Sequence, residues 1–258
     1  AACVALYLTV LFLEILPAAA EWLRMSKLRE ILVRATIGLT IFGVILSTLH
    51  QSSLGSMFLI VPNKIHPLWY STFLPIYFFV SSMIAGLSMV IFESSISHRA
   101  FKNIIDAEPH PFDHDKIVLG LGKAAAIVLF GYLGIKILGV AHGNHWHLLA
   151  TPYGYWFLVE VLGFVLLPAI LYGVGARNGN VKLIKFTGFL AVFGVVLNRF
   201  NVCLVAFNWQ LPAAQRYFPG FMEFMVSLTL VTAGLVAFKW IVTRMPILTE
   251  HPEFRESH

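Results

Sequence analysis

Long uncharged runs of apolar residues recur through almost the whole chain, and they constrain its fold more than any other feature. A helix that crosses a membrane needs about 20 mostly apolar residues. Seven segments meet this requirement, at about 1–20, 33–50, 72–93, 117–140, 154–175, 183–205 and 221–243. None alternates apolar and polar residues with a period of two, which excludes a transmembrane barrel. The sequence therefore predicts an all-α polytopic membrane protein in which the helices form bundles.

The composition of the 258 residues agrees with this prediction. Hydrophobic residues make up 58% of the chain and charged residues 12%, whereas soluble proteins have about 45–50% apolar and about 25% charged residues. Soluble enzymes and nucleic-acid-binding domains are therefore excluded. Cys3 and Cys203 lie in separate apolar stretches, so we expect neither a disulfide framework nor a cysteine metal cluster.

The first ten residues, AACVALYLTV, have no Met, no basic region and no cleavage site of a signal peptide. The sequence therefore opens inside a helix, and we expect further residues before Ala1. We predict one transmembrane helical domain over residues 1–245, followed by a polar cytoplasmic tail over residues 246–258.

The basic residues predict the orientation of the helices, because Lys and Arg in short loops stay on the cytoplasmic side. Thirteen of the 18 basic residues lie in or beside every second loop, and therefore on one face of the membrane. The loops on the opposite face hold only Lys64 and Arg216. The loops at 50–70, 142–154 and 207–220 therefore face the periplasm or its equivalent. We expect a multi-pass protein of the cytoplasmic (inner) membrane, with lipid as its main surroundings.

Few ionisable residues lie inside the predicted spans, where a charge costs at least about 2.5–3.5 kcal/mol near the centre. Such residues are candidates for a proton pathway or for structural ion pairs, and here they are Glu14, Glu93, Glu160 and Arg199. Glu93 lies at a cytoplasmic helix end and could simply reach water. Lys123 and Lys136 lie close enough to helix ends to snorkel to the membrane surface, so no role is assigned to them.

His50 closes an apolar run and opens the polar stretch Gln51-Ser52-Ser53-Leu54-Gly55-Ser56. An imidazole at this depth can hydrogen-bond a quinone carbonyl or accept a proton from a quinol. It could equally be an interfacial histidine bonded to a neighbouring loop. A b-type haem is disfavoured, because the other nine histidines lie in loops, helix ends or the tail. A metal site from the closely spaced histidines 142, 145 and 147 has an unspecific spacing.

Two long strings carry a family resemblance. Residues 47–94 read STLHQSSLGSMFLIVPNKIHPLWYSTFLPIYFFVSSMIAGLSMVIFES, and this segment closely resembles the corresponding stretch of the NrfD/PsrC superfamily of quinone-interacting membrane subunits. The most similar branch is the HybB-like one, with the related subunits of Hmc- and Dsr-type respiratory complexes. Residues 197–210, LNRFNVCLVAFNWQ, and residues 217–248 are similar to the last two helices of that branch.

The resemblance implies a subunit with eight to ten membrane-spanning helices and no haem or metal of its own. A ten-helix parent would place about three helices before Ala1. The resemblance also implies a quinone, with menaquinone expected, near the periplasmic face, where a ferredoxin-like iron–sulfur subunit docks. Further redox subunits of hydrogenase or multihaem cytochrome type are expected partners, and the complex is expected to act in anaerobic respiration. Nucleic acid is not an expected partner.

The resemblance also assigns residues. His50 corresponds to a polar motif at the quinone pocket, and Arg199 matches an Asn-Arg pair of the penultimate helix. Some relatives place an acidic residue in the middle of the helix that follows the histidine motif, whereas Phe79, Val80, Ser81 and Ser82 stand there in this chain. A proton route from a carboxylate to the histidine therefore cannot be carried over.

We therefore expect a quinone-reactive subunit that is catalytic only within its complex, with His50 and Glu14 as the catalytic residues. His50 would donate to the quinone carbonyl and accept the departing proton, and Glu14 would pass a proton inward. The head group would be oriented and walled by Gln51, Ser52, Ser53, Trp69 and Tyr70. A membrane aromatic belt is the alternative reading of Trp69 and Tyr70.

Two other functions remain open at this point. The chain could be a proton- or ion-translocating or secondary-transport subunit in which Glu14, Glu93, Glu160 and Arg199 carry protons without redox chemistry, or it could be a passive membrane anchor of a redox enzyme. Within the quinone hypothesis, we expect Glu160 and Arg199 to pair between packed helices. The pair would serve proton movement or bundle stability and not quinone binding.

Overall fold

The computed structural model describes residues 2–100 and 114–244, and these residues form helices and connecting loops without a strand. Seven helical segments in this part are long and apolar enough to cross a membrane, and they confirm the predicted all-α polytopic class. They are α1 (Ala2–Trp22), α2 with η1 (Ser26–Ile60), α3 (Leu74–Ala100), α5 (His114–His142), α6 to α7 (Pro152–Arg177), α8 with η4 (Val181–Val205) and α9 (Phe221–Arg244).

The chain divides into two compact units. Of the described residues, the first contains 2–47 and 218–244, and the second contains 48–100 and 114–217. The helix α2 (Ser26–Met57) contributes residues to both units. The single transmembrane domain stays a prediction, and the expected tail lies outside the described residues.

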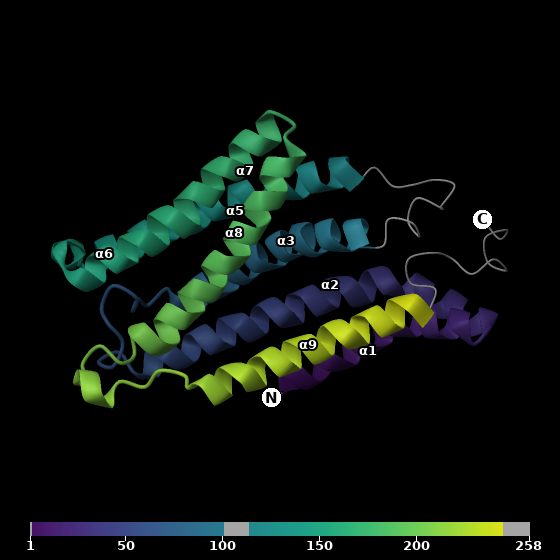
Figure 1. The fold of residues 1–258 in the computed structure, drawn as a ribbon, viewed down its shortest axis with the longest axis horizontal. Helices are drawn as coiled ribbons and strands as arrows, with labels where there is room; N and C mark the ends of the chain where they lie inside the picture. The colour runs from purple at the N-terminus through teal and green to yellow at the C-terminus, as the bar shows by residue number, and fades with distance from the viewer. Residues whose placement is uncertain (1, 101–113, 245–258) are drawn as a thin grey trace. The chain divides into compact units, whose positions relative to one another are not determined.

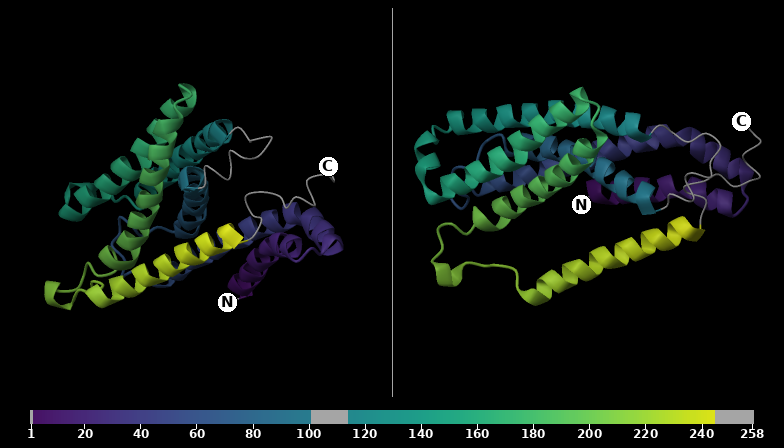
Figure 2. Two further views of the ribbon diagram at one scale, coloured as in Figure 1. Left: turned by 45° about the vertical axis from the view of Figure 1, so that its right-hand side comes forward. Right: turned by 45° about the horizontal axis from the view of Figure 1, so that its top comes forward.

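Four membrane-spanning segments form the second unit's bundle. The helix α3 packs against α5 and α8, and α7 (Leu167–Arg177) packs against the same two helices, which also contact each other (Figures 1 and 2). Lys185 and Asp115 approach to 3.6 Å at one end of the bundle. At the other end the His66 amide donates to the Ala206 carbonyl at 2.9 Å. The loops predicted to share a membrane face therefore do meet.

The helix α2 continues beyond His50, where the sequence predicted a polar loop. This prediction was wrong, because the segment from Gln51 to Met57 has no proline and its glycine packs against α3. A Cβ atom at Gly55 would lie 2.7 Å from the Leu74 carbonyl oxygen and 3.0 Å from Phe78 Cβ. Glycine is therefore required for this close approach, and His50 lies two turns before the end of α2.

Two of the spans contain π-helical segments, η3 (Val159–Leu166) and η4 (Asn201–Val205). Pro168 follows η3 and has no N–H with which to continue a regular helix. In η4 the Ala206 amide donates to the Asn201 carbonyl at 2.7 Å, five residues back. Single π turns within α-helices are frequent at functional sites. Here they carry Glu160 and Asn201.

The described part of the first unit contains α1, α2 up to Ser47, and α9. Gly43 of α2 allows close contact with α1, since a Cβ atom there would lie 3.1 Å from Val10 Cγ1. In α9 only Val242 is buried within the described structure.

Candidate functional site: a buried charge cluster in the second unit

Glu160 lies at the centre of a polar cluster inside the membrane-spanning bundle, and its side chain is 1% exposed. Its Oε1 atom is 3.3 Å from Lys136 Nζ and accepts from Asn198 Nδ2 at 2.6 Å. Its Oε2 atom accepts from Trp69 Nε1 at 2.8 Å and from Asn201 Nδ2 at 2.6 Å. An ionised carboxylate offers about four lone-pair sites and only accepts. These four donors therefore match it.

Lys136 supplies the charge that balances this carboxylate. Its side chain is buried, and Nζ lies 5.4, 5.7 and 5.3 Å from the ring centroids of Tyr77, Tyr132 and Phe157. The expectation that Lys136 snorkels to the membrane surface was wrong. The helix α5 continues to His142, so Lys136 lies about 9 Å inside that end at 1.5 Å per residue. Both the carboxylate and the aromatic faces favour the cation there.

Arg199 does not form the expected direct pair with Glu160. Its NH1 donates to Asn198 Oδ1 at 3.3 Å, and its NH2 donates to Ser81 Oγ at 2.7 Å and weakly to the Phe78 carbonyl at 3.4 Å. The guanidinium carbon also lies 3.7 Å from the ring centroid of Phe78. Asn198 and Arg199 are consecutive on a helix and point about 100° apart. Asn198 therefore faces Glu160, while Arg199 turns toward α3.

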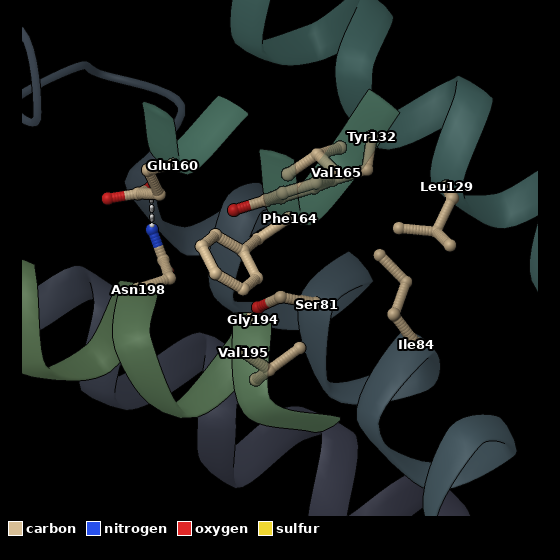
Figure 3. A pocket seen from close by; sticks show the side chains of 10 residues that line it. All are labelled: Ser81, Ile84, Leu129, Tyr132, Glu160, Phe164, Val165, Gly194, Val195 and Asn198. Carbon is tan, nitrogen blue, oxygen red and sulfur yellow. Dashed lines mark hydrogen bonds between the residues drawn. The ribbon is translucent and has the colours of Figure 1, made fainter. Parts of the chain in front are cut away.

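A small cavity lies beside the cluster (Figure 3). It is lined by Ser81, Ile84, Leu129, Tyr132, Glu160, Phe164, Val165, Gly194, Val195 and Asn198. Its volume is about 10 Å³, which is roughly the space that one water molecule needs. The buried Tyr132 hydroxyl has no hydrogen-bond partner in the described part of the chain, and it points toward the side of Glu160 and Asn198 (Figure 3). The cavity therefore suits one water that bridges these groups.

The predicted quinone-site residues lie on α2 and in the loop after it. His50, Gln51, Ser52 and Tyr70 are half-buried, and Ser53 is exposed. The described residues give the His50 imidazole no hydrogen-bond partner, whereas Trp69 is buried and its indole donates to Glu160. The structure therefore connects Trp69 with the charge cluster.

The other predicted carboxylates have separate surroundings. Glu14 on α1 is partly buried and accepts a 2.7 Å hydrogen bond from Thr40 on α2, within the first unit. Glu93 on α3 is exposed and accepts from Ser97 one turn later, at 2.6 Å. Within the described part of the second unit, no hydrogen bond or ion pair joins Glu93 to Glu160. The role of these residues in a proton pathway stays a prediction.

His66 is a second feature that the sequence analysis missed. It lies outside the membrane spans, and its buried ring has its centroid 5.5, 4.9 and 4.9 Å from those of Trp69, Tyr153 and Trp209. Its Nδ1 accepts from the Leu68 amide at 3.2 Å. Burial, together with the nearby charge of His145, lowers the pKa of His66 to about 4. The ring is therefore neutral at physiological pH.

Neither metal nor haem ligation is supported by the described residues. They contain no group of three or more His, Cys, Asp or Glu side chains that could hold a metal ion. A b-type haem would need two axial histidines within facing helices, and in the described ranges His66 is the only histidine that is buried. It lies in a loop.

The fold and the cluster define a class, namely polytopic helical membrane proteins with a charged network inside a helix bundle. Residues 1–209 match the family model described as "Polysulphide reductase, NrfD", and the chain belongs to this NrfD family. This result confirms the resemblance found in the sequence.

Two relatives extend the comparison. The chain is 57% identical to a protein of Nitratidesulfovibrio vulgaris Hildenborough over 256 residues, which cover 99% of this chain and 66% of the relative. It is 26% identical over 251 residues to the Escherichia coli K12 protein named "Probable Ni/Fe-hydrogenase 2 b-type cytochrome subunit", covering 96% and 62% of the two chains. The chain thus spans about two thirds of these relatives' lengths. No solved structure matches it.

Proposed function

We propose that this chain is the quinone-reactive membrane subunit of a respiratory oxidoreductase complex. It exchanges electrons between an iron–sulfur subunit on the periplasmic side and the quinone pool of the membrane. Membership in the NrfD family and homology to a hydrogenase membrane subunit support the redox assignment.

The observation that carries the proposal is the polar surface near the end of α2. His50, Gln51 and Ser52 are consecutive and half-buried within the last two turns of a membrane-spanning helix. Polar side chains at that depth require partners, and the described residues offer none to the His50 imidazole. A quinone supplies a carbonyl acceptor for an imidazole N–H, and a quinol supplies a proton to an imidazole nitrogen.

The proposed roles follow from these chemistries. Reduction of a quinone takes two electrons and two protons, and oxidation of the quinol releases them. His50 exchanges one proton with the bound oxygen, and Gln51 or Ser52 hydrogen-bonds the head group. Glu14, which Thr40 holds within the first unit, passes a proton toward the cytoplasmic side.

The finer assignments are part of the same proposal. Menaquinone is the proposed quinone, and the inner membrane of an anaerobically respiring cell is the proposed location. The iron–sulfur subunit is ferredoxin-like, and its further partners are of hydrogenase or multihaem cytochrome type. No haem is proposed for this chain, so the electrons reach the quinone from the iron–sulfur subunit.

Substitution of His50 tests the proposal. His50→Ala removes both the hydrogen-bond donor and the proton acceptor, and we expect quinone-linked electron transfer to fall by about 100-fold or more. A half-buried residue contributes little to packing, so the complex should still assemble. The measurement is quinone turnover of the purified full-length complex, with subunit content checked on the same sample.

Two controls sharpen this experiment. Ser56→Ala changes an exposed residue on the same helix that has no assigned role, and it should leave turnover within about threefold of the wild type. Quinone extracted from the purified complex should co-purify with the wild-type protein and be depleted in His50→Ala. Wild-type turnover in an assembled His50→Ala complex would sink the assignment.

A further inference from the structure

We propose that Arg199 is a quinone-binding residue. Its guanidinium stabilises the negative charge that develops on the quinone oxygen when the quinone is reduced. This inference rests on the proposed function and reverses the expectation that Arg199 serves proton movement or bundle stability and not quinone binding. It adds a cationic residue from α8 to a site otherwise built from α2. Three observations carry it: the unused donors of Arg199, its unbalanced charge, and its position against Phe78, which contacts the end of α2.

The guanidinium of Arg199 is held in place but not saturated. Ser81 Oγ, the Phe78 carbonyl and Asn198 Oδ1 accept from NH2 and NH1. A guanidinium has five N–H groups, so the Nε hydrogen and one NH1 hydrogen find no acceptor in the described structure. The Arg199 side chain is also only half-buried. A ligand can therefore reach two donors on a group whose orientation is already fixed.

The positive charge of Arg199 is also not balanced. Glu160 is already paired with Lys136 at 3.3 Å, and no carboxylate of the described residues lies within ion-pair distance of Arg199. Arg199 reaches the cluster only through the neutral amide of Asn198. A cation in such a position within a membrane bundle favours an anionic neighbour.

The position of Arg199 places it beside the predicted quinone-site helix. The guanidinium stacks on Phe78, and Phe78 Cβ is where α3 meets Gly55 of α2. The two helices run in opposite directions there. Gln51 lies four residues before Gly55 and so on the same face of α2, one turn along. Phe78 alone therefore separates Arg199 from the end of α2, the helix that also carries His50 and Gln51.

The chemistry explains why an arginine suits this place. When electrons arrive before protons, negative charge develops on the quinone oxygen, and a pre-oriented cationic donor stabilises it most where water is scarce. The guanidinium keeps its proton under all relevant conditions. Arg199 therefore holds the charge without taking part in proton transfer, and His50 remains the proton-exchanging group.

Two variants of Arg199 in the full-length complex test the inference. Arg199→Gln removes the charge, and we expect the KM for a short-chain menaquinone analogue to rise by about tenfold or more, because hydrogen bonds to charged groups are lost. Arg199→Lys keeps the charge without the planar fork, so its KM should lie between those of wild type and Arg199→Gln. Melting temperature and subunit content show whether each complex is intact. Lys123→Gln, which neutralises an exposed lysine on α5, should leave KM unchanged.

The outcomes separate this inference from the proposed function. If Arg199→Gln has wild-type KM and turnover while His50→Ala is impaired, Arg199 does not bind quinone but the proposed function stands. If neither variant changes quinone turnover, the proposed function itself fails. If the Arg199→Gln complex does not assemble, the Arg199→Lys complex provides the test. A raised KM in Arg199→Lys supports contact between Arg199 and the quinone, and a wild-type KM overturns the inference.

Discussion

At the scale of single residues, the Glu160–Lys136 pair is the most costly feature of the bundle and also the most completely compensated. Both side chains are buried, 3.3 Å apart, and Glu160 accepts three further hydrogen bonds. Transfer of two charges out of water costs several kcal/mol each, and their attraction repays this only with good geometry and satisfied neighbours. The pair is therefore nearly neutral when intact and strongly destabilising when half of it is removed.

Glu160→Gln should destabilise the protein, because it leaves the Lys136 ammonium buried without a counter-charge. Breaking a buried pair typically costs about 3–5 kcal/mol, so we expect a clear drop in melting temperature in detergent. Lys136→Met in the same chain should restore much of the loss, since a methionine fits among the three aromatic rings around Nζ.

Arg199→Gln provides the matched control for this rescue. It removes a positive charge from the same region, but one that reaches Glu160 only through Asn198. Combined with Glu160→Gln, it should recover much less stability than Lys136→Met does. If Lys136→Met and Arg199→Gln restored equal stability to Glu160→Gln, Glu160 would be paired with both cations.

His66 should make stability depend on pH in mildly acidic solution. Its pKa in the folded protein is about 4, below the ordinary value of 6.5, so the unfolded chain binds the proton more readily between these values. Stability should hold above pH 6.5, fall as the pH drops from 6.5 toward 4, and level off below 4. One unit of pKa difference corresponds to about 1.4 kcal/mol. Melting temperatures between pH 8 and pH 5 would measure this fall.

His66→Asn is the variant for this measurement. The amide oxygen of asparagine can accept from the Leu68 amide as Nδ1 does, but it does not titrate. The slope between pH 6.5 and pH 5 should therefore become shallower in His66→Asn. An unchanged slope would assign the acid sensitivity to other groups, such as His145, whose pKa burial also lowers.

At the scale of helices, the sequence predicts the seven spans well, because a span needs only length and low polarity. It predicts their ends less well. The residues Gln51 to Ser56 read as a polar loop, yet they are helical because Gly55 packs against α3. Lys136 reads as a lysine near a helix end, and its burial depends on a carboxylate from another helix. Such pairings follow from tertiary packing, which hydropathy does not encode.

The asparagines of α8 and η4 are the signal that could have revealed the cluster. Asn198 and Asn201 are three residues apart in an otherwise apolar span, so they share a helix face. Both amides donate to Glu160. The π turn that begins at Asn201 could not be predicted in the same way, because the residues of η4, NVCLV, contain no proline or glycine that would indicate an irregular helix.

At the scale of the whole molecule, the family fixes the class of protein and the charge distribution predicts its orientation in the membrane. Within the second unit, Asp115 and Lys185 meet at the end that carries the excess of basic residues. The loops around His66 and Ala206 meet at the opposite end. Basic residues of short loops remain on the cytoplasmic side, so the end with His66 is predicted to face the periplasm.

Cysteine labelling tests this orientation. Ser56 near the end of α2 and Asn178 between α7 and α8 are both exposed. Asn178 is preferable to Gly179, where φ is +64° and a cysteine would be strained. In a background with Cys3 and Cys203 replaced by serine, an impermeant thiol reagent on whole cells should label Ser56→Cys. Asn178→Cys should react only after the membrane is permeabilised. Labelling of Asn178→Cys in intact cells, with Ser56→Cys protected, would invert the topology and place His50 on the side opposite to the proposed iron–sulfur partner.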